Sequence, residues 1–171
     1  AAIQTRGGNW SACLAACRQV GDDEPELNPS QLCALLINRG LANLSLGNSP
    51  DAEDDLGRAA QTAAEHGLAD QEFKARHNLA CLAFVDGDLA RALVLMRQAD
   101  ARDAAVSRDR ARLDQAEVLL EAGLVDGART ALAEALTAAR SEGHRLEEGE
   151  ISLRLARCDL LAGDHDGARR H

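Results

Sequence analysis

The chain has 171 residues and a formal net charge of −9, with Lys74 as its only lysine. This charge argues against nucleic acid as a partner, because binding to phosphates requires concentrated lysine and arginine. No apolar run approaches the length that crosses a bilayer and no secretory signal is visible, so we expect a cytoplasmic protein without membrane contact.

The composition is that of a nearly all-helical protein. Alanine, leucine, arginine, glutamate and aspartate dominate, while runs of β-branched and aromatic residues, which favour strands, are missing. Arginine almost replaces lysine, which is typical of a high-GC, actinobacterial coding sequence. Acidic residues cluster at 22–24, 51–55 and 147–150, and we interpret these clusters as solvated helix faces, with a site for a basic ligand as the alternative.

A glycine followed five positions later by a small residue recurs five times along the chain. The pairs are Gly8–Cys13, Gly47–Ala52, Gly87–Ala92, Gly123–Ala128 and Gly163–Ala168. Successive glycines stand 39, 40, 36 and 40 residues apart, and this period is typical of stacked supersecondary units. Such an array favours a binding surface over an active site.

Each repeat is interpreted as two helices joined by a turn. The glycine is expected just past the end of the first helix, in the left-handed conformation that costs glycine little. A second set of small residues lies seven positions before four of the glycines, namely Gly40, Ala80, Ala116 and Ala156. Small residues allow two helices to cross closely. The residues expected to be almost fully buried at such crossings are Gly40, Ala52, Ala80, Ala92, Ala116 and Ala128.

In chain order, the pattern predicts the second helix of a broken repeat at about 10–20, three complete helix pairs, and one helix at about 145–162. Ser49 is expected to cap a helix whose first residue is Pro50. No polar capping surface resembles those that shield the ends of solenoids, so we expect a fragment of a longer protein.

The repeated pattern resembles the tetratricopeptide repeat family. The matches are Leu79-Ala80, Gly87-Asp88-Leu89, Ala92 and Met96 in one copy, Asn38-Arg39-Gly40 and Gly47-Asn48 in another, and Leu155-Ala156 with Gly163-Asp164 in a third. Two features depart from the family: Leu, Ala or Val fill most aromatic positions, and the spacing exceeds the usual length of about 34 residues. An unrelated alanine-rich helical bundle is the alternative.

The resemblance implies an all-α fold, a TPR-like α-solenoid of antiparallel helix pairs forming a right-handed superhelix. It also implies a single array over residues 1–171. Its parts are a partial repeat at 1–27, repeats at about 30–67, 68–106 and 107–143, and a partial repeat at 145–171. Residues 114–123 and 154–164 are further similar to the repeat stems of actinobacterial CHAT-domain proteins, in which repeats precede a caspase-like peptidase domain, and to the repeat arms of large transcriptional regulators.

In this family the first helix of each pair lines a concave groove. The resemblance therefore implies a partner-binding groove formed by Asn38, Lys74, His77, Asn78, Arg110, Asp114, Arg154 and Arg157. Asn38 and Asn78 occupy the same repeat position, where family members bind a peptide backbone with the donor and acceptor of an amide. Asp114 and Glu150 contradict a clamp for a terminal carboxylate, so a groove of mixed charge for a peptide or helix is expected.

His77 and Cys81 stand four residues apart on a predicted helix. A nucleophilic dyad would also require an orienting group and an oxyanion site, and the sequence shows no candidate for either. A zinc site would require further ligands nearby, and the sequence offers only these two. The five cysteines contain no Cys-x-x-Cys pair, and we expect reduced thiols, with Cys13 and Cys17 buried by packing. No enzyme activity, cofactor or metal is predicted.

Three functions remain open from the sequence. The first is a non-catalytic scaffold that binds a protein or peptide in its concave groove. The second is the regulatory or sensor stem of a CHAT-type peptidase, and the third is a self-assembly element that forms a homo-oligomer through uncapped ends.

Overall fold

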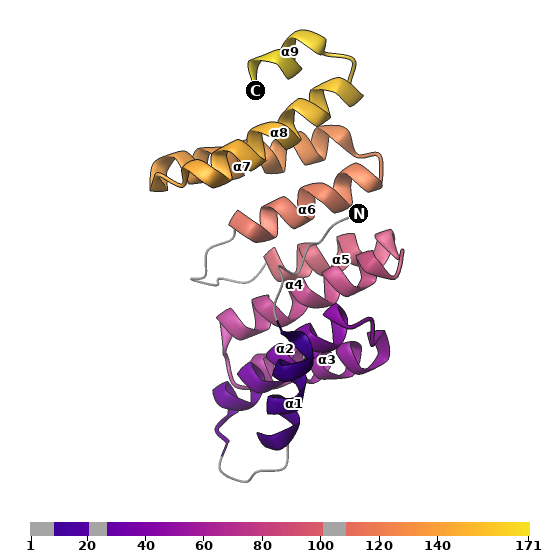
Figure 1. The fold of residues 1–171 in the computed structure, drawn as a ribbon, viewed down its shortest axis with the longest axis vertical. Coiled ribbons are helices and arrows are strands. Elements are labelled where there is room, and N and C mark those ends of the chain that lie inside the picture. The colour runs from indigo at the N-terminus through magenta and orange to yellow at the C-terminus, as the bar shows by residue number, and fades with distance from the viewer. Residues whose placement is uncertain (1–8, 21–26, 101–108) are drawn as a thin grey trace. The chain divides into compact units, whose positions relative to one another are not determined.

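The computed structural model describes residues 9–20, 27–100 and 109–171, and this described part contains nine α-helices and no strand (Figure 1). The helices are α1 (Trp10–Val20), α2 (Pro29–Ser45), α3 (Ser49–Glu65), α4 (Ala69–Val85), α5 (Leu89–Asp100), α6 (Asp109–Glu121), α7 (Val125–Glu142), α8 (Arg145–Leu161) and α9 (His165–Arg170). The predicted start near Gly8 lies outside the described residues.

The chain divides into two compact units, residues 1–106 with α1–α5 and residues 107–171 with α6–α9. Within each unit, helices pack against their neighbours along the chain as adjacent pairs, and α2 also contacts α4. The expected all-α fold of the solenoid class is confirmed, while the single continuous array and the handedness of its superhelix stay predictions. None of the described helices is both long and apolar enough to span a membrane.

Glycine ends the first helix of each pair, as the repeat pattern predicts. Gly47 follows α2 with a φ of 79°, and its N–H donates to the carbonyl oxygen of Leu44 at 3.2 Å. The residues at the equivalent positions, Gly87, Gly123 and Gly163, also have positive φ. Two further glycines with positive φ, Gly67 and Gly143, end α3 and α7, and the sequence analysis did not single them out.

The predicted cap of α3 is wrong. The capping position is Asn48, without a side-chain cap, and Ser49 is already helical. The Ser49 hydroxyl instead donates to Asp86 at 2.9 Å. A full capping box occurs at α2, where the side chains of Asn28 and Gln31 each accept a hydrogen bond from the other residue's backbone N–H at 3.0 Å.

Small residues lie buried in the helix cores, as expected. Ala52, Ala80, Ala92, Ala116 and Ala128 are fully buried, and Gly40 is buried too. The last repeat departs from this pattern, because Ala156 and Ala168 are only half-buried. Cys17 is buried as predicted, but Cys13 is half-buried, because α1 buries mainly one side, with Leu14 and Cys17, in its short length of 11 residues.

Each unit has its own apolar core. In the first unit, Leu36 and Ile37 of α2 form one cluster with alanines of α3 and with Ala75 of α4. In the second unit, α6, α7 and α8 contribute to one cluster that includes Leu132 and Ile151. The helices that carry the predicted groove residues are therefore fixed in position by packing inside their own unit.

Candidate functional site

The first unit carries three predicted groove residues on α2 and α4. Asn38 and Lys74 are exposed and Asn78 is half-buried, and α2 and α4 pack directly against each other. Lys74 and Asn78 stand one turn apart on α4, and Asn38 and Asn78 each precede their turn glycine by nine residues. Within the described ranges, none of these three side chains forms a hydrogen bond or an ion pair, so their polar groups are available to a ligand.

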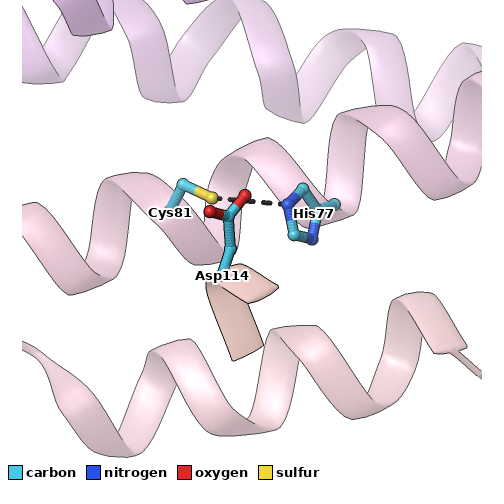
Figure 2. A group of neighbouring side chains, drawn as sticks. All are labelled: His77, Cys81 and Asp114. Atoms are coloured by element: carbon cyan, nitrogen blue, oxygen red, sulfur yellow. Dashed lines mark hydrogen bonds between the residues drawn. The ribbon is translucent and has the colours of Figure 1, made fainter. Parts of the chain in front are cut away.

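The fourth groove residue of this unit, His77, is engaged by its own helix. Its ring stacks on Phe73, with ring centroids 6.0 Å apart and an interplanar angle of 10°. Its Nε2 lies 3.6 Å from the Sγ of Cys81, as Figure 2 shows on α4. The structure thus brings His77 and Cys81 together in the way that their spacing predicts, and it holds the imidazole between two neighbours of the same helix.

Two of the three predicted cationic groove residues of the second unit are paired with carboxylates. On α8, Arg154 pairs with Glu150 at 2.8 Å, and Arg157 pairs with Glu117 at 3.2 Å and with Glu121 at 3.4 Å. The Arg154–Glu150 pair lies within α8, and the two Arg157 pairs join α8 to α6, so both guanidinium groups are already partnered. Of the other two predicted residues, Asp114 on α6 is buried, and the side chain of Arg110 lies outside the described part.

A buried ion pair that the sequence analysis missed lies between α2 and α3. Asp55 is only 3% exposed and accepts hydrogen bonds from Nε of Arg39 at 2.9 and 3.0 Å, with a further contact from Nη2 of Arg39. The Nδ2 of Asn43 donates to the same carboxylate at 3.1 Å. The interpretation of residues 51–55 as a wholly solvated face is therefore wrong for Asp55, whose partner stands 16 residues away.

An open cavity of about 280 Å³ lies beside this ion pair, between α1, α2 and α3. Its lining residues are Leu14, Arg18, Arg39, Asn43, Asp51, Asp54 and Asp55. Asp55 and Asn43 on its inner wall are satisfied by the network just described and by Asn48, whose Nδ2 donates to Oδ1 of Asn43 at 3.3 Å. The inner wall of the cavity therefore consists of polar groups that are already hydrogen-bonded to one another. Two exposed aspartates, Asp51 and Asp54, lie at its rim.

The cysteines differ in how accessible they are. Burial raises the pKa of the Cys17, Cys33 and Cys158 thiols above their ordinary value, which lowers their thiolate fraction at neutral pH. Cys13 is half-buried, whereas the other four are buried. These thiols are therefore positioned for packing, and the two classes can be separated by their reactivity.

We expect a thiol reagent at neutral pH to label Cys13 first in the folded protein, with Cys33 and Cys158 reacting only after unfolding. The physical reason is that the reagent attacks through the thiolate, which burial both disfavours and covers. The measurement is a labelling time course followed by peptide mass spectrometry, with and without urea. Labelling of Cys33 as fast as that of Cys13 in the native protein would contradict the described packing.

Comparison with known proteins yields a structural likeness alone. No protein-family model matches the sequence, and no curated protein matches it. The crystal structure of BtubC (BKLC) from P. vanneervenii is similar to this chain, with a TM-score of 0.81 and 18% identity, over 95% of this chain and 70% of that chain. At this identity the likeness supports the helical repeat-like fold and says nothing of a shared ligand.

Proposed function

We propose that the chain is a non-catalytic interaction module of the tetratricopeptide type, and that it binds an extended peptide segment of a partner protein across α2 and α4. The observation that carries the proposal is that the side chains of Asn38, Lys74 and Asn78 form no hydrogen bond or ion pair within the described residues. They lie on two helices that pack together. An amide offers one acceptor and two donors, which matches the alternating carbonyl and N–H groups of an extended backbone.

The charge of the surface selects among peptides. Lys74 is an exposed cation without an ion-pair partner among the described residues, so it favours a peptide with an acidic side chain near the backbone held by Asn78. In contrast, Arg154 and Arg157 already have carboxylate partners, and a ligand would have to replace those contacts. The proposed site is therefore the α2–α4 surface rather than a groove along all four first helices.

The proposal includes the absence of catalysis by the His77–Cys81 pair. Support comes from the burial of Cys81, which covers the thiol, and from the stacking of His77 on Phe73, which holds the imidazole against its own helix. A protein that binds without catalysis needs only positioned donors and acceptors, and those are what α2 and α4 present.

The test is a peptide-binding titration. A fluorescent acidic peptide, selected against the protein from a library of ten-residue peptides, is titrated by anisotropy against the wild type and variants. We expect Asn78→Ala to weaken binding by about 1–3 kcal/mol, because it removes a buried two-point contact to the peptide backbone. Lys74→Ala should also weaken binding, with a loss that shrinks as the salt concentration rises.

Two controls distinguish this surface from the rest of the chain. Gln61→Ala removes an exposed amide of similar size from α3, where the side chain donates a hydrogen bond to Glu65, and it should leave the affinity unchanged. Arg157→Ala should have a smaller effect than Lys74→Ala, because Arg157 is already paired. Equal affinities for Asn78→Ala and the wild type would remove the proposed site.

A further inference from the structure

Two cysteines of α1 lie on the same side of that helix, about one turn apart. Cys13 and Cys17 are separated by four residues, and side chains at this spacing are neighbours whose Cβ atoms lie about 5–6 Å apart. The helix is regular at this point, because Asn9 caps it. The Oδ1 of Asn9 accepts from the N–H of Ala12 at 3.1 Å, and its carbonyl oxygen accepts from the N–H of Cys13 at 2.9 Å. The two thiols are also close enough to share a hydrogen bond.

This thiol pair lies at the border between the core and the solvent. Cys17 is 8% exposed, on the buried side of α1 that also carries Leu14, whereas Cys13 is half-buried. Burial is the largest cause that raises the pKa of the Cys17 thiol, followed by the proximity of Cys13. Arg39 acts in the opposite direction and favours the thiolate, more strongly than Asp55 disfavours it. A ligand can therefore reach the pair at Cys13 and be shielded from water at Cys17.

A disulfide does not fit the spacing of these two residues. It requires Cβ atoms about 3.5–4.5 Å apart, which is closer than neighbouring turns of a helix place them. An ion between the two sulfurs adds two bonds to the link, so the backbone can keep its helical form. The geometry therefore favours a ligand shared by both thiols over a bond between them.

The number of available ligands selects the kind of ion. Among the residues that the structure describes, no histidine, cysteine or carboxylate completes a group of three metal ligands with Cys13 and Cys17. Zinc takes four ligands in structural sites, and calcium and magnesium require oxygen ligands. Cu(I) is a soft ion that thiolates select, and two thiolates on opposite sides of the ion complete its coordination.

We propose that Cys13 and Cys17 form a two-thiolate binding site for Cu(I) on α1. When the ion binds, two Cu–S bonds form, the two thiol protons pass to the solvent, and no electron is transferred. The helix needs no unwinding, because the ion spans the distance that one turn sets between the side chains. The site lies on α1, outside the α2–α4 surface, and is independent of the proposed peptide binding.

The test is a competition for Cu(I) in the absence of oxygen. The reduced chain is titrated into the coloured complex of Cu(I) with bicinchoninate, and the loss of colour measures the ion that the chain withdraws. We expect the wild type to withdraw one equivalent more than Cys13→Ser, whose half-buried position tolerates the change; circular dichroism verifies its fold. X-ray absorption of the loaded wild type should show two sulfur neighbours around this ion.

A matched control keeps the number of thiols and changes only their spacing. Ala12 is exposed, and in the variant Ala12→Cys/Cys13→Ser the first thiol moves by about 100° around the helix. This variant should withdraw no more Cu(I) than Cys13→Ser. Cys81→Ser removes the thiol beside His77 on α4 and should keep the equivalent that depends on Cys13.

Three results would each overturn the proposal. The first is equal uptake of Cu(I) by the wild type and Cys13→Ser, and the second is full uptake by the variant with shifted spacing. The third is a disulfide between Cys13 and Cys17 that forms on mild oxidation while the helix content stays unchanged, because the spacing argument forbids it.

Discussion

Replacing Arg39 with alanine should lower the free energy of unfolding by about 3–5 kcal/mol, the range expected when one partner of a buried ion pair is removed. Arg39 holds both oxygens of Asp55 through its Nε, and Asp55 is 3% exposed. Without the guanidinium, the carboxylate would stay in the core with Asn43 as its donor. Urea unfolding followed by circular dichroism measures the loss.

A matched control separates this effect from the removal of any arginine. Arg58 of α3 approaches Asp54 at 3.9 Å, with both side chains exposed, so Arg58→Ala should cost less than about 1 kcal/mol. The double variant Arg39→Ala/Asp55→Ala should lose less stability than the sum of the two single variants, because it leaves no unpaired charge. A loss of less than about 1 kcal/mol for Arg39→Ala would show that the carboxylate reaches water.

The second large effect is expected from Gly40→Ala. A Cβ added at this position of α2 would lie 2.7 Å from Cγ and 2.9 Å from Cδ2 of Leu56, which is fully buried in α3. Overpacking of this kind costs about 1–3 kcal/mol and exceeds the gain of up to about 1 kcal/mol from replacing glycine inside a helix. We therefore expect a lower unfolding midpoint in urea.

Gly57→Ala provides the opposite result. Gly57 lies inside α3, and no atom lies within 4 Å of an added Cβ. Here only the helix propensity changes, so the variant should be more stable than the wild type by about 0.5–1 kcal/mol. Opposite changes in stability from the same glycine-to-alanine substitution at the two positions would establish that α2 and α3 are in contact at Gly40. Stabilisation by both would contradict that close approach.

The repeat pattern predicted the fold because it encodes local requirements. A left-handed turn calls for glycine at Gly47, and a close helix crossing calls for a small residue at Ala52 and Ala92. Each of these requirements acts through one residue type at a fixed distance along the chain. The helix pairs and most of the buried small positions were therefore readable from the sequence.

The candidate site was less readable, because its chemistry depends on pairs of side chains far apart in sequence. Asp55 is paired with a residue 16 positions away, and Arg157 with Glu117 at 40 positions. Periodicity identifies the helix face on which Arg157 lies, but it does not identify which carboxylate from another helix reaches it. The unpaired state of Asn78 could be recognised only once the neighbouring helices were in place.

The mainly sequential packing of the helices has a consequence for how the protein is made. Within each unit, a helix contacts mainly the helix before it and the helix after it. The contact between α2 and α4 skips one helix. Contacts between near neighbours close short loops, which makes folding fast. Each new helix can therefore dock on the preceding one as the ribosome delivers it, so assembly can follow translation helix by helix from the N-terminal end.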